Sequence, residues 1–160
     1  NWVTAWVAIT DSNEHNGCMR MWAGSHKENL KQHDQKFNEG NLLTRGQTIK
    51  DVPRKETTPL ILTAGQMSLH HPTVVHGSDL NKSDDRRIGF VIQSYIGTNV
   101  EQVLGKNGVQ IARGKDNYNF HEIIERPKSL MDKNDLKIKK QENDNLQEIF
   151  YKGSSKKGTY

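Results

Sequence analysis

The sequence of 160 residues contains a single cysteine, Cys18, so no intrachain disulfide can form. This excludes a small secreted scaffold held by disulfides and favours a reducing, cytoplasmic compartment. No hydrophobic run approaches the roughly 18 residues of a membrane span, and the first residues show no signal-peptide pattern. Hydrophobic residues make up only 32% of the chain and aromatic residues 7%. We therefore expect one small polar domain with no membrane partner.

The net charge of +4 is not spread evenly along the chain. Residues 1–125 hold 14 Lys and Arg against 14 Asp and Glu, whereas residues 126–160 hold nine against five. A basic tail can bind nucleic acid, but these lysines alternate with acidic residues and have few aromatic neighbours. The pattern favours a solvated helix, and we expect no nucleic-acid partner.

Several segments have the composition and alternation of β-strands, and turn-forming residues at 11–17 and 77–85 separate some of them. Pro72 in the segment Met67–Val75 indicates an edge strand or an irregular stretch there. The expected extended segments are Trp2–Thr10, Cys18–Ala23, Leu60–Thr63, Met67–Val75 (with Pro72) and Arg86–Ile96.

The pattern changes after Ile96. Val100–Leu104 and Leu136–Tyr151 have helical periodicity, and strands followed by helices indicate a β core with appended helices. We therefore expect residues 1–97 to form the core and residues 98–160 an extension of the same domain. Residues 27–59 show no sustained period and are predicted to be a long loop that lies over a small-molecule substrate.

His76 and Arg87 are separated by eleven positions with a turn between them. In an antiparallel hairpin centred near Asn81 they would face each other on the polar side of the sheet. Neutral imidazole is a good Fe(II) ligand, and guanidinium binds carboxylates in a bidentate manner. The pair suits an iron enzyme with a dicarboxylic acid cosubstrate. A structural His76 and a surface ion pair of Arg87 are the alternatives, although we expect the neighbouring Arg86 to make the ion pair.

Three blocks carry a resemblance to a known family: Trp6–Lys27, Leu62–Asn81 and the pair Arg86-Arg87. They resemble the phytanoyl-CoA dioxygenase family of Fe(II)- and 2-oxoglutarate-dependent oxygenases, as do Arg113–Asp116 and Gln147–Gly153 in the tail. The resemblance implies a mainly β fold, a partial double-stranded β-helix (a jelly roll of the cupin type) with C-terminal helices.

The resemblance also implies roles for four residues. His76 matches the distal histidine of the 2-His-1-carboxylate triad that binds Fe(II). Arg87 matches the arginine that binds the far carboxylate of 2-oxoglutarate, and Ser78 matches a hydroxyl that helps to hold it. Trp6 matches an aromatic residue of the cosubstrate pocket, with ordinary core packing as its alternative role.

The His-x-Asp motif that supplies the other two iron ligands in this family does not occur in the sequence. We expect those ligands upstream of residue 1, so that this chain is a fragment of an oxygenase of the hydroxylase type acting on a small organic substrate. Two alternatives stay open, namely a non-haem iron halogenase on the same scaffold and a jelly-roll binding module that has lost its iron. Missing strands would expose sheet edges, through which a homodimer could form.

Overall fold

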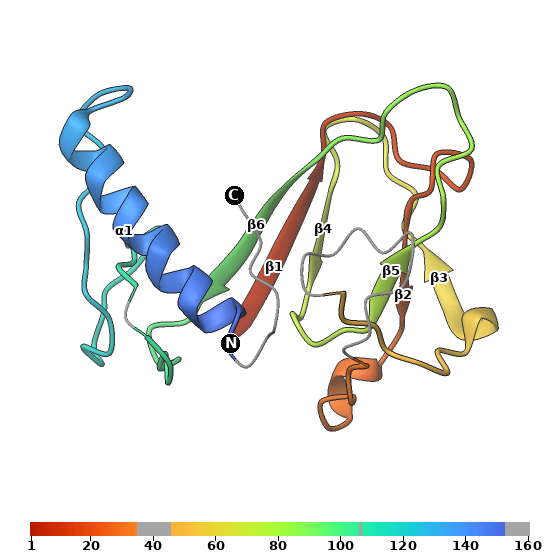
Figure 1. Cartoon of the computed structure of the whole chain (residues 1–160), viewed down its shortest axis with the longest axis horizontal. Coiled ribbons are helices and arrows are strands. Elements are labelled where there is room, and N and C mark those ends of the chain that lie inside the picture. The colour runs from red at the N-terminus through yellow and green to blue at the C-terminus, as the bar shows by residue number, and fades with distance from the viewer. Residues whose placement is uncertain (35–45, 106, 153–160) are drawn as a thin grey trace. The chain divides into compact units, whose positions relative to one another are not determined.

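The computed structural model describes residues 1–34, 46–105 and 107–152 (Figure 1). Part of the expected 27–59 loop, the last residue of the Gln147–Gly153 block and the Gly/Ser/Lys terminus lie outside the described residues. Contacts divide the chain into a β unit, formed by Trp2–Lys36 and Gln47–Ile96, and a second unit whose main segment is Gly97–Tyr160.

The β unit consists of two three-stranded antiparallel sheets among the described residues (Figure 1). One sheet has the order β4-β1-β6 and the other the order β3-β2-β5. The chain is thus mainly β, and the two sheets form a partial jelly roll. The strands are β1 (Trp2–Ala8), β2 (Met19–Trp22), β3 (Thr57–Pro59), β4 (Met67–His70), β5 (His76–Ser78) and β6 (Gly89–Ile96).

The core of the β unit lies between the two sheets. Trp6 and Ala8 of β1 pack against Met19 of β2, and the three side chains are at most 9% exposed. Met21, Leu60 and Leu62 pack against this cluster. Because alternate residues of a strand point to opposite faces, these contacts identify which face of each strand looks into the core.

The prediction that His76 and Arg87 face each other across a hairpin is wrong. β5 pairs with β2, whereas β6 pairs with β1 in the other sheet, and Arg87 precedes β6. A turn around Pro72 likewise separates β4 from β5 and sends them to different sheets. Sequence alternation identifies the two faces of a strand but not its partner, and in a jelly roll consecutive strands commonly belong to opposite sheets.

Three smaller predictions also need correction. The strand expected at Leu60–Thr63 is shorter and earlier, at Thr57–Pro59, with only an isolated bridge between Leu62 and Ser12. The segment Val100–Leu104 is not helical. Strict alternation along Arg86–Ile96 predicts that Phe90, Ile92 and Ile96 share one face. A register shift between the Val3 and Ala5 pairings instead puts Ile96 on the opposite face from Phe90 and Ile92.

The second unit contains helix α1 (Lys133–Phe150), close to the predicted Leu136–Tyr151. The Asp132 side chain caps the helix by accepting hydrogen bonds from the backbone N–H groups of Asn134 and Asp135. Within the described ranges, no helix has the length and apolar character needed to span a bilayer.

Gly89 is required for the packing of Trp6. A Cβ atom at position 89 would overlap the Trp6 indole, which is buried. We expect Gly89→Ala to lower the free energy of unfolding by about 1–3 kcal/mol through overpacking, measured from the midpoint of urea unfolding. Gly77→Ala is the matched control, because no described atom lies within 4 Å of its added Cβ. Equal losses in the two variants would contradict this account.

Candidate cosubstrate and metal site

Arg87 lies half-buried just before β6. One guanidinium nitrogen, Nη2, donates a hydrogen bond to Ser78 Oγ at 3.2 Å. The guanidinium carbon lies 5.5 Å from the centre of the Trp6 ring, a cation–π distance. The structure therefore brings together three of the four residues singled out from the sequence, although not through the hairpin that was predicted.

Arg87, unlike Arg20 and Arg54 of the β unit, has no carboxylate as an ion-pair partner among the described residues. The ion pair expected for the Arg86 side chain is not formed among the described residues either. The Asp85 carboxylate instead accepts a hydrogen bond from the backbone N–H of Arg86. A half-buried guanidinium with a hydroxyl partner and an aromatic wall is well suited to binding an anionic group.

Ser78 and His76 are exposed, and strand pairing places them on the same face of their sheet as Met19 and Met21. Ser78 lies opposite Met19 and His76 lies opposite Met21, and directly opposed residues of an antiparallel pair point to the same face. Met19 packs against Trp6 in the core. The side chains of Ser78 and His76 therefore lie on the face that looks toward the Trp6 sheet.

The imidazole of His76 has the tautomer that a metal ligand needs. Its Nδ1 lies 2.7 Å from the backbone carbonyl oxygen of Val74. Because a carbonyl only accepts, Nδ1 carries a proton, and in the neutral imidazole the lone pair is then on Nε2. A backbone contact of this kind fixes both the tautomer and the ring orientation of metal-binding histidines. His76 thus presents Nε2 as one possible metal ligand.

A second histidine lies beside His76. The ring centroids of His70 and His76 are 5.7 Å apart, and His70 Nδ1 lies 3.3 Å from Ser68 Oγ. Burial lowers the pKa of His70, and the neighbouring His76 lowers it further. His70 is therefore held in its neutral form beside the candidate ligand. His71 instead stacks on His26, with ring centroids 5.6 Å apart, and hydrogen-bonds to Thr73.

The residues of this chain fit a 2-oxo acid site better than a complete iron site. Arg87, Ser78 and Trp6 form a place for a carboxylate. Among the described residues, however, no group of three or more His, Cys, Asp and Glu side chains could hold a metal ion. His76 can supply one ligand of a facial triad, and the described residues do not supply the other two.

Comparison with known proteins identifies the family. The sequence model of the phytanoyl-CoA dioxygenase (PhyH) family matches residues 1–89, which include Trp6, His76, Ser78 and Arg87. The chain belongs to the phytanoyl-CoA dioxygenase family. The match covers more than half of the chain and ends at the first residue of β6.

Relatives and solved structures agree with this assignment. The chain is 34% identical over 86 residues to the peroxisomal phytanoyl-CoA dioxygenases of Mus musculus and Homo sapiens, and each match covers 53% of this chain and 25% of the relative. An apo structure of the non-heme monooxygenase ThoJ is similar with a TM-score of 0.77 and 30% identity, over 92% of this chain and 52% of ThoJ. A ThoJ–nickel complex gives a TM-score of 0.72 and 26% identity, over 94% of this chain and 52% of ThoJ. The chain thus spans about a quarter of these curated relatives and half of ThoJ.

Proposed function

We propose that this chain is part of an Fe(II)- and 2-oxoglutarate-dependent oxygenase that hydroxylates a small organic substrate. The observation that carries the proposal is Arg87, which stacks on Trp6, bonds Ser78 and has no carboxylate partner in the described part of the molecule. Its setting offers a dicarboxylic acid one bidentate ionic contact, one hydroxyl and one aromatic wall. The family membership and the likeness to a non-heme monooxygenase support the same function.

In this proposal Arg87 binds the far carboxylate of 2-oxoglutarate and the Ser78 hydroxyl contributes a hydrogen bond to it. The Trp6 indole forms one wall of the pocket and excludes water from the ionic contact, which strengthens it. His76 binds iron through Nε2, while its Nδ1–H stays on the Val74 carbonyl. When bound, iron would allow O₂ to act as the oxidant, with 2-oxoglutarate giving up two electrons as it is decarboxylated to succinate, and the protein would supply orientation and a dry pocket.

The other two iron ligands belong, in this proposal, to sequence that precedes residue 1. The described residues contain no three-ligand group, and the chain spans about half of ThoJ. The proposal extends neither to phytanoyl-CoA as substrate nor to a particular compartment, because the matches to the peroxisomal enzymes cover only a quarter of their length.

The test is product analysis with a longer chain that includes the upstream residues, supplied with Fe(II), O₂, 2-oxoglutarate and a panel of small organic acids and amides. We expect succinate to form and substrate mass to increase by one oxygen atom. Incorporation of chlorine when chloride is present would instead identify a halogenase. Absence of succinate together with absence of iron would identify a binding module, and either outcome would contradict the proposal.

A further inference from the structure

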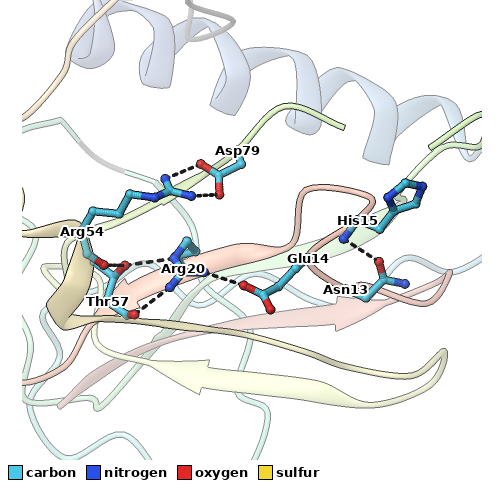
Figure 2. A network of polar contacts seen from close by, with 7 residues as sticks. All are labelled: Asn13, Glu14, His15, Arg20, Arg54, Thr57 and Asp79. Carbon is cyan, nitrogen blue, oxygen red and sulfur yellow. Dashed lines mark hydrogen bonds and ion pairs between the residues drawn. The ribbon is translucent and has the colours of Figure 1, made fainter. Parts of the chain in front are cut away.

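A network of charged and polar side chains links Arg20 of β2, Thr57 of β3, Arg54 and Asp79, the residue that follows Ser78 (Figure 2). Arg20 of β2 lies opposite Gly77 of β5, so it points away from the face that carries His76 and Ser78. Asp79 directly follows β5, and its carboxylate binds Arg54 and interacts electrostatically with Arg20. The charged network therefore reaches the residue next to Ser78 of the candidate site.

Asp79 is held in a bidentate manner by Arg54. Nη1 of Arg54 donates to Oδ1 of Asp79 at 2.5 Å, and Nη2 donates to Oδ2 (Figure 2). This contact lowers the pKa of Asp79, with the nearby Arg20 charge acting in the same direction, so the carboxylate stays ionised near neutral pH. Two parallel hydrogen bonds fix an orientation as well as a distance.

Arg54 is itself tied to the sheet. Its carbonyl accepts a hydrogen bond from Thr57 Oγ1 at 2.7 Å, and Arg20 donates to both the hydroxyl and the carbonyl of Thr57. Arg20 also forms an ion pair with Glu14 at 2.9 Å, as Figure 2 shows. The backbone of Arg54 is thus anchored through strand β3 to strand β2 and to the 14–17 turn.

The backbone after Ser78 is held from a second side. The Lys82 N–H donates to the His15 carbonyl at 3.0 Å. A Cβ atom at Gly17 would lie 2.5 Å from the Asp79 carbonyl oxygen, so the segment passes directly over this glycine, whose φ is +72°. Segment 79–82 is therefore fixed by its backbone on the 13–17 turn and by its Asp79 side chain on Arg54.

We propose that Asp79 and Arg54 are positioning residues for the 2-oxo acid site: they fix the Ser78 hydroxyl and, through it, the Arg87 guanidinium. This inference rests on the proposed function. Ser78 is the hydrogen-bond partner of Arg87, and it directly precedes the held segment 79–82 as the last residue of β5. A small displacement of positioning groups can change an enzyme's affinity or rate by up to roughly 100-fold.

The test compares Asp79→Asn and Arg54→Gln with the wild type in the longer, iron-loaded chain, by equilibrium binding of 2-oxoglutarate and by steady-state kinetics with this cosubstrate varied. We expect the dissociation constant and KM to rise by roughly 3- to 30-fold, with kcat changed less than about twofold. The double variant should bind 2-oxoglutarate as tightly as either single variant, because each substitution removes the same Arg54–Asp79 contact. Hydrogen exchange at the Lys82 amide should become faster in both variants.

The matched control is Lys140→Gln, which removes an exposed ion pair with Asp144 on α1 and should leave 2-oxoglutarate binding unchanged. Asp79→Glu and Arg54→Lys, which keep the charges, should restore part of the affinity. Wild-type affinity in Asp79→Asn and Arg54→Gln would overturn the inference and leave the proposed function standing. If the wild-type chain binds no 2-oxoglutarate at all, both fail.

Discussion

In the longer chain that includes the upstream residues, replacing Arg87 by alanine should raise the 2-oxoglutarate concentration needed for half-maximal turnover by on the order of 30- to 1,000-fold. The reason is the loss of a bidentate, charge-assisted contact in a partly dry site, worth on the order of 2–4 kcal/mol. The guanidinium rests on Trp6 and bonds Ser78, so little reorganisation is needed when the cosubstrate binds. The measurement is the dependence of succinate formation on 2-oxoglutarate concentration.

Arg86→Ala is the matched control for this prediction. Arg86 is the preceding residue with the same charge, it is exposed, and its backbone atoms form hydrogen bonds with Thr10 and Asp85 that alanine would keep. The substitution should change the requirement for 2-oxoglutarate by less than about twofold, the size expected for an exposed charge. Equal effects of the two substitutions would remove the assignment of Arg87 as the carboxylate anchor.

In the longer chain that includes the upstream residues, replacing His76 by alanine should weaken iron binding by at least roughly 100-fold and abolish turnover. The loss of a metal ligand exceeds the 10- to 100-fold effect of losing a residue that only hydrogen-bonds to a ligand. The prediction follows from the Nε2 lone pair left free by the Val74 contact. Iron content by atomic emission and succinate formation are the two readouts. Full iron occupancy in His76→Ala would show that the metal is held elsewhere.

His15→Ala provides the comparison for His76. His15 is exposed in the 14–17 turn, and its backbone N–H and carbonyl form hydrogen bonds with Asn13 and Lys82 that alanine would keep. Iron content and turnover should stay at wild-type values in this variant. A comparable loss would mean that removal of any histidine disturbs the protein, and that His76 has no special role.

The sequence predicted which residues share a face of a strand better than it predicted which strands pair with each other. Alternation along Trp2–Thr10 puts Thr4 and Trp6 on one face of the strand, and the regular pairing of β1 with β4 agrees. The family resemblance grouped Trp6, Ser78 and Arg87, which the structure brings together. The predicted hairpin failed because the turn-rich segment 77–85 connects strands of different sheets. No local pattern distinguishes a short hairpin from a connection that crosses between two sheets.

The Asp79–Arg54 contact shows a second limit of sequence reasoning. Arg54 lies in a stretch without periodicity, 25 positions before Asp79, and charged pairs at such separations leave no signal in one sequence. The start of α1 was placed three residues late for a related reason. Its first turn, Lys133 to Asp135, has no apolar residue, and the capping role of Asp132 is visible only in the structure.

The most direct test of the central claim, that His76 is one ligand of a three-ligand iron site, is iron stoichiometry measured on two lengths of chain. The 160-residue chain should bind Fe(II) only weakly, because its described residues supply one ligand of the three. A longer chain that includes the upstream residues should bind one iron per protein and convert 2-oxoglutarate to succinate. Stoichiometric iron in the 160-residue chain, or neither iron nor succinate with the longer one, would contradict the account.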